Sequence, residues 1–187
     1  MKKIFVLSGL FLAVLIFSPA VDAQAVNDQE YYKIPAGNKP DSFFLDKKFC
    51  SKYSLDPRSK DNLMRVWFNN KSKDSIQMLF DIRYWCKTED EAKKYLKDHL
   101  AALSEDGKPN KDLVTINGIT DLHVYHESEQ MRKTFEGMKL NYKQINFIFR
   151  VKNIVLKVFV ACNKRYTSRQ LQIFAQEAAN RTIKALK

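Results

Sequence analysis

LNYKQINFIFRVKNIVLKVFVAC, residues 140–162, is the most strongly β-patterned stretch of the chain. Apolar residues alternate with other residues on both sides of Lys152-Asn153, a two-residue turn candidate in which asparagine tolerates a positive φ. A turn there predicts an antiparallel hairpin whose apolar sets share one face, and this fixes the register. The facing pairs would be Val151–Ile154, Phe149–Leu156, Phe147–Val158 and Ile145–Val160.

Two amphipathic helices and several further strands are predicted around this hairpin. Thr88 and Glu91 form a capping-box pattern at the start of one helix, which Gly107 ends. Thr167 or Ser168 begins a second helix that runs close to residue 186. The remaining expected elements are a short helix or strand within 41–53, a turn at 55–59, strands at 63–69, 75–87, 113–117 and 119–126, and a polar loop at 127–139.

This order predicts an α/β fold of the α+β kind, a mostly antiparallel sheet sandwiched by helices. In the strands at 63–69 and 75–87, the alternating apolar residues that include Met64 and Ile76 share one face. Trp67 and Trp85 fall on the opposite face, where they either form a ligand platform or pack under a helix. The outer face of the long hairpin is also partly apolar, so we expect both faces to be covered.

The element order resembles the Mog1/PsbP-like fold over about residues 41–187. The resemblance rests on the strand pair ending at Cys86, the TEDEAKKYLKDHL helix, the INGITDLHVYHE segment, the long hairpin and the last helix, without a diagnostic motif. It implies a binding or assembly role in partner complexes rather than catalysis.

The N-terminal residues predict export. Met1-Lys2-Lys3 is followed by an apolar run and by the small-x-small cleavage site Val21-Asp22-Ala23. The run is shorter than the roughly 20 residues that a bilayer needs, which favours a signal peptide over an uncleaved anchor. We expect a signal peptide at 1–23, a flexible N-terminal arm at 24–40 and a single α/β domain at 41–187, located in a periplasm or secreted to the medium.

The chain carries 32 Lys and Arg residues against 21 Asp and Glu residues, a net charge of +11. This balance favours an acidic partner, either a protein or an anionic surface of lipid headgroups or glycan. The basic residues occur as scattered pairs, and no nucleic-acid-binding motif is present, so no specific nucleic acid is expected. The candidate binding surface consists of Trp67, Trp85, Arg150, Lys152 and Lys157. We expect a monomer that does not span a membrane.

Three cysteines remain in the expected mature chain: Cys50, Cys86 and Cys162. Export permits disulfides, and the odd number leaves at least one thiol unpaired within the chain. Cys50 and Cys86 are the candidate disulfide pair, with Cys86–Cys162 and the absence of any bridge as alternatives.

No residue pattern indicates a particular chemistry. His123 and His126 could share a metal on a helix, but on a strand they would point to opposite faces. No phosphate-binding loop, dinucleotide fingerprint or G-x-S-x-G motif occurs, and we expect no cofactor and no metal. The favoured hypothesis is an exported, non-catalytic binding or accessory protein, such as a secreted bacterial virulence or envelope factor. A small exported hydrolase that uses His99, His123 or His126 is the alternative.

Overall fold

A computed structural model describes residues 40–60, 63–69, 75–106, 114–119, 121–126, 142–163 and 165–187. The predicted signal peptide, the N-terminal arm up to residue 39 and the polar loop at 127–139 lie outside the described residues.

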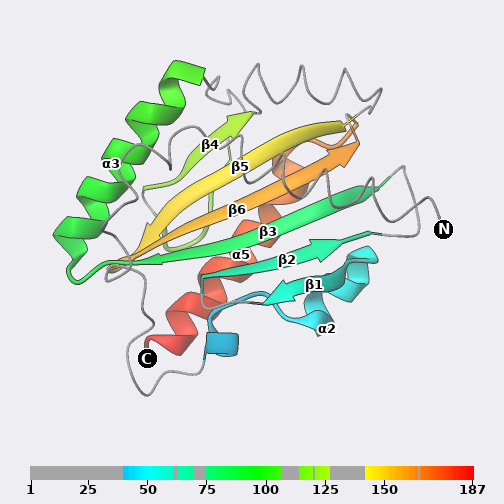
Figure 1. Cartoon of the computed structure of the whole chain (residues 1–187), viewed down its shortest axis with the longest axis horizontal. Coiled ribbons are helices and arrows are strands. Elements are labelled where there is room, and N and C mark those ends of the chain that lie inside the picture. Colours follow the sequence, from blue (N-terminus) through cyan, green and yellow to red (C-terminus); the bar gives the residue numbers. More distant parts are fainter. Residues whose placement is uncertain are drawn as a thin grey trace.

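A six-stranded antiparallel sheet forms the centre of the described fold (Figure 1). Its strands follow the order β1-β2-β3-β6-β5-β4, and each neighbouring pair is antiparallel. The predicted fold class, an antiparallel sheet with helices, is thereby confirmed. The strands are β1 (Asp56–Lys60), β2 (Met64–Phe68), β3 (Ile76–Trp85), β4 (His123–His126), β5 (Tyr142–Val151) and β6 (Ile154–Asn163).

The two long helices cover opposite faces of the sheet. Helix α5 (Ser168–Ala185) buries Leu171 and Phe174 in the main core, together with the inner residues of β5 and β6. Helix α3 (Glu89–Asp106) buries Ala92 and Leu96 against Ile148 and Val155 on the other face. A short helix α2 (Lys47–Cys50) lies between the 3-10 helices η2 (Pro40–Ser42) and η3 (Ser51–Tyr53).

The β5–β6 hairpin has the predicted register. All four facing pairs expected from the sequence occur, and their residues belong to the main core. At the turn, however, Lys152 and not Asn153 has the positive φ, 52°. Asn153 instead donates from its side chain to the Cys86 carbonyl at 2.6 Å and accepts from the Cys86 N–H at 2.9 Å. The turn is therefore tied to the end of β3.

The main core lies on the sheet face that carries the tryptophans. Trp67 and Trp85 are 2% and 3% exposed, and Phe43 meets Trp85 edge to face at 4.7 Å between ring centroids. They are interior residues, so the ligand-platform hypothesis is wrong. The opposite set forms a smaller apolar cluster of Val66, Met78, Phe80, Phe159 and Ala161, with Met64, Phe68 and Ile82 partly buried against it.

Two local expectations differ from the structure. The expected turn at 55–59 is largely the edge strand β1, where Pro57 is tolerated because an edge residue need not donate to the ladder. The expected strand at 113–117 is absent from its described part, because residues 114–116 have no regular structure and Asn117-Gly118 forms a turn with φ 79° at the glycine. The expected strand at 119–126 shortens to β4.

Candidate binding site between helices α2 and α5

A buried ion pair on β3 holds the chain segment that leads into α2. Asp81 and Arg83 are fully buried and bind each other. Asp81 also accepts from the Leu45 N–H at 2.7 Å, and Arg83 donates to the Phe43 carbonyl at 3.0 Å. Burial raises the pKa of Asp81 and lowers the pKa of Arg83, while each partner opposes the shift of the other. The pair therefore fixes the backbone just before α2 to the sheet.

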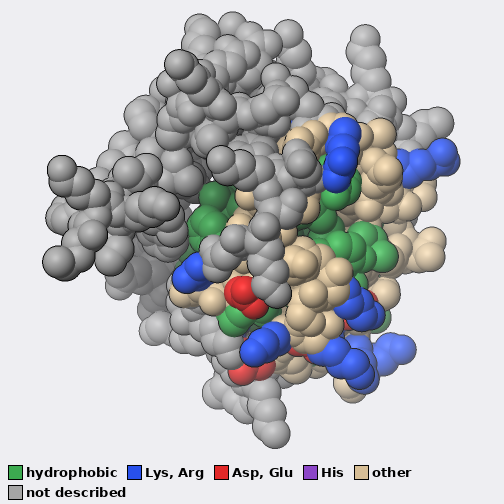
Figure 2. Space-filling view, turned by 90° about the vertical axis from the view of Figure 1, so that its right-hand side faces the viewer, with side chains coloured by type: hydrophobic (Ala, Val, Ile, Leu, Met, Phe, Trp, Pro, Cys, Tyr) green, Lys and Arg blue, Asp and Glu red, His purple; other side chains and the backbone are tan. Residues whose placement is uncertain are grey.

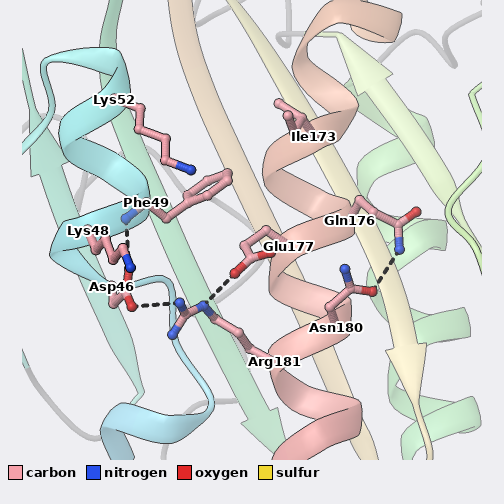
Figure 3. Close-up of a pocket in the computed structure, with 9 residues that line it drawn as sticks. All are labelled: Asp46, Lys48, Phe49, Lys52, Ile173, Gln176, Glu177, Asn180 and Arg181. Atoms are coloured by element: carbon pink, nitrogen blue, oxygen red, sulfur yellow. Dashed lines mark hydrogen bonds and ion pairs between the residues drawn. The ribbon is translucent and has the colours of Figure 1, made fainter.

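Helix α2 is capped by a carboxylate that also binds α5. Asp46 accepts from the Phe49 N–H at 2.8 Å and from Arg181 at 2.6 Å. Arg181 donates further to Glu177 at 2.9 Å, so one guanidinium holds two carboxylates (Figure 3). Burial alone would raise the pKa of Asp46, but the Phe49 N–H and Arg181 together bring it below its ordinary value. Asp46 is therefore ionised at neutral pH and joins the two helices.

Aromatic packing completes the contact between the two helices. Phe49 and Tyr53 lie against Phe174 of α5, with ring centroids 5.7 Å and 4.6 Å away. Beside these rings is an open pocket of about 390 Å³. It is lined by Asp46, Lys48, Phe49, Lys52, Ile173, Gln176, Glu177, Asn180 and Arg181 (Figure 3).

The pocket contains an exposed apolar side chain among cations. Ile173 is 43% exposed, the largest exposure of any large apolar side chain among the described residues. The Lys52 ammonium lies 5.9 Å from the centroid of the Phe49 ring. Arg169 is also exposed and precedes Ile173 by four residues, so the two are neighbours on one face of α5. The pocket therefore presents an apolar side chain, Ile173, and positively charged side chains on the same surface.

The pocket contains charges of both signs. Arg181 pairs with both Asp46 and Glu177, whereas Lys48 and Lys52 make no ion pair with another described residue. Lys48 lies beside Asp46 (Figure 3). Along α5, Gln176 donates to Asn180 at 3.0 Å (Figure 3) and accepts from the Asn117 N–H at 2.8 Å. This arrangement suits a ligand with an acidic group beside an apolar one.

The candidate surface expected from the sequence does not form one patch. Trp67 and Trp85 are in the core, and Lys152 is exposed at the hairpin turn. Arg150 is engaged internally: it pairs with Asp121 at 2.9 Å and with Glu89 at 3.4 Å. These pairs join β5 to the start of α3 and to the segment before β4.

Lys157, the fifth residue of that set, lies on the sheet face that α3 covers. It is partly exposed on β6 between Ile82 of β3 and Ile148 of β5, and burial lowers its pKa to about 8. His99 of α3 is 8% exposed and stacks on Tyr95 at 6.0 Å between centroids. Burial, followed by the charge of Lys157, lowers the pKa of His99 to about 4. His99 Nε2 has no hydrogen-bond partner among the described residues.

Sequence reasoning missed Lys48, Lys52 and Ile173 as site residues. The available signal was Ile173, which lies off the face of α5 that Leu171 and Phe174 define. The lysines carried no such signal, because their position opposite α5 depends on packing between distant segments.

The expected Cys50–Cys86 disulfide is not formed. Cys50, Cys86 and Cys162 are all buried, and none of them is part of a disulfide. Cys50 and Cys162 belong to the main core, whereas Cys86 packs with Ala92 and Leu96 under α3. Cys50 and Cys86 therefore lie on opposite faces of the sheet, too far apart for a bridge without backbone movement.

Comparisons with known proteins support the fold. No protein-family model matches the chain, and no curated protein matches its sequence. The structure is similar to the extracellular domain of PknH from Mycobacterium tuberculosis, with 12% sequence identity and a TM-score of 0.52 over 79% of this chain and 100% of that chain. A crystal structure from Bacteroides thetaiotaomicron has 9% identity and a TM-score of 0.43 over 66% of this chain and 40% of that one.

At this identity the likeness to the PknH domain shows a shared fold. The comparison with solved structures does not confirm the Mog1/PsbP-like resemblance expected from the element order. Among the described residues, no helix combines the length and the apolar composition needed to cross a bilayer.

Proposed function

We propose that this chain is an exported, non-catalytic binding protein whose α2–α5 pocket receives an acidic segment of a protein partner. The observation that carries the proposal is that the exposed Ile173 lines one open pocket together with Lys48 and Lys52. Export is supported by the signal-peptide pattern at residues 1–23 and by the extracellular location of the PknH domain, whose fold is similar.

The charge distribution favours an acidic partner. The chain has a net charge of +11, which attracts acidic molecules and speeds their encounter. Figure 2 shows lysine and arginine side chains distributed around apolar patches on one side of the molecule. At the pocket, Lys48 and Lys52 are exposed and can pair with carboxylates of a ligand.

The pocket suits a polypeptide better than a flat anionic membrane. Asp46 and Glu177 lie within it, and their carboxylates would repel a continuous layer of anionic headgroups. An extended peptide can instead place its acidic side chains on Lys48 and Lys52 and a bulky apolar side chain on Ile173.

Binding to immobilised peptides tests this function. The peptides should vary in acidic content and in the presence of one leucine or phenylalanine, with scrambled basic peptides as the reference. We expect acidic-apolar peptides to bind, and Lys48→Glu/Lys52→Glu to weaken them by roughly tenfold or more, because attraction becomes repulsion.

The matched control is Lys94→Glu/Lys97→Glu, which makes the same charge change at exposed positions of α3 on the other face of the sheet. It should retain most of the binding. Equal loss in both double variants would show that only net charge matters, and the absence of binding to any acidic peptide would also refute the proposal.

A further inference from the structure

The α2–α5 pocket lies close to the point at which the N-terminal arm joins the described domain. The 3-10 helix η2, where the described chain begins, contacts α5 (Figure 1). Arg181 of α5 donates to the carbonyl of Phe44 at 3.4 Å, and Asp46, which follows η2 closely in the sequence, lines the pocket. The arm therefore enters the domain beside the pocket.

The arm carries side chains of the kind that the pocket suits. Residues 28–32 read Asp-Gln-Glu-Tyr-Tyr, so two carboxylates come directly before two aromatic rings. We call these residues the DQEYY segment. Lys48 and Lys52 can pair with its carboxylates, and a tyrosine ring can pack on the exposed side chain of Ile173. The chain thus contains an acidic-apolar peptide of its own.

The arm is long enough to bring this segment to the pocket. An extended chain spans about 3.3 Å per residue, so the link from Tyr32 to Pro40 can cover up to about 26 Å. Along α5 the rise from Arg181, which contacts the segment after η2, to Ile173 is about 12 Å. The DQEYY segment can therefore lie over the pocket while η2 stays in place.

We propose that the DQEYY segment occupies the α2–α5 pocket of its own chain and that an acidic partner must displace it. This inference rests on the proposed function, because it assigns an internal competitor to the same pocket. A ligand on a short tether has an effective concentration in the millimolar range, so even weak contacts fill the pocket for part of the time. The arm thereby lowers the apparent affinity for every partner and leaves the pocket to those that bind it most tightly.

Peptide binding to the full chain tests this inference. The arm variant Asp28→Asn/Glu30→Gln/Tyr31→Ser/Tyr32→Ser removes both the acidic and the aromatic contacts of the DQEYY segment. The probe is a fluorescent synthetic peptide with the sequence of residues 26–35, and its affinity is measured by fluorescence anisotropy. We expect it to bind the arm variant at least roughly threefold more tightly than the parent, because no tethered copy competes for the pocket.

Two controls connect the peptide to the pocket. Adding Lys48→Glu/Lys52→Glu to the arm variant should weaken the peptide by roughly tenfold or more, because attraction becomes repulsion. Asp90→Asn/Asp98→Asn makes the same charge change as the arm variant, but at exposed positions of α3 on the other face of the sheet. It should leave the affinity of the peptide at the parental value.

The inference is wrong if the peptide binds the parent and the arm variant equally, or if Asp90→Asn/Asp98→Asn gains as much affinity as the arm variant. Its failure can be told apart from failure of the proposed function. If acidic-apolar peptides bind the parent but the peptide of residues 26–35 does not bind the arm variant, the pocket is a peptide site and the arm is not its ligand. If Lys48→Glu/Lys52→Glu changes the binding of neither, both proposals fail.

Discussion

Asp81 and Arg83 show how single residues determine where α2 lies. Both are fully buried, and together they bind the backbone of Phe43 and Leu45. The Arg83 guanidinium also lies 5.1 Å from the centroid of the Phe44 ring. An ion pair in such a place contributes less to stability than its geometry suggests, because both charges lose their hydration. Its effect is to specify one position for the segment before α2.

Replacing Arg83 alone should be strongly destabilising. We expect Arg83→Met to lower the free energy of unfolding by about 3–5 kcal/mol, because Asp81 keeps a buried charge without a partner. The double variant Asp81→Leu/Arg83→Met should recover much of this loss. Chemical denaturation of the parent and both variants measures the difference. Equal losses in the single and double variants would contradict this account.

His99 should make stability depend on pH. Its pKa is about 4 in the folded protein, against a value near 6.5 in the unfolded chain. Between these values the unfolded chain binds the extra proton, so stability is fully present above about pH 6.5 and decreases as the pH falls towards 4. The free energy of unfolding should fall by about 3 kcal/mol in total over this pH range. Urea denaturation across this range should show a smaller slope in His99→Gln, and an unchanged slope would argue against the effect.

At the scale of elements, a strong apolar periodicity in the sequence predicted strands and helices correctly, whereas a weak one did not. The β5–β6 register followed from alternation on both strands, and α3 and α5 followed from their capping residues and apolar stripes. The turn expected at 55–59 is mostly strand, because β1 is held by its pairing with β2 and not by its own composition.

The choice of core face could not be made from alternation. β2 and β3 carry apolar residues on both faces, so the period shows which residues share a face but not which face receives the larger layer. The larger layer is the one under α5, with Trp67 and Trp85 inside it. The α2–α5 pocket was equally inaccessible, since Asp46 and Arg181 are 135 positions apart in the sequence.

Helix α2 has only four residues and depends on its anchors. We expect Arg181→Gln to free Asp46 from α5 and to increase amide exchange in residues 46–53, while exchange in α3 stays unchanged. Hydrogen exchange with mass spectrometry measures both segments in one sample. The control Arg169→Gln lies on the same helix and makes no ion pair with another described residue, so it should leave exchange in α2 as it was. Uniformly faster exchange in Arg181→Gln would mean that the whole domain had been destabilised.

At the scale of the whole molecule, the three thiols are divided between the two faces of the sheet. Burial raises the pKa of Cys86 to about 11 and that of Cys50 further, so neither is a thiolate at neutral pH. We expect the native protein to react slowly with dithionitrobenzoate and to release three equivalents after denaturation. Fewer equivalents would indicate a disulfide and would contradict the structure.

The outermost strands of the described sheet affect how readily copies of this protein associate edge to edge. β1 contains Pro57 and an irregularity between Pro57 and Ser59, and β4 is only four residues long. Neither edge strand presents a long, flat row of unpaired backbone N–H and C=O groups with which a strand of another copy could pair. Molecules of this protein should therefore stay dispersed at high local concentration instead of joining side by side into ribbons.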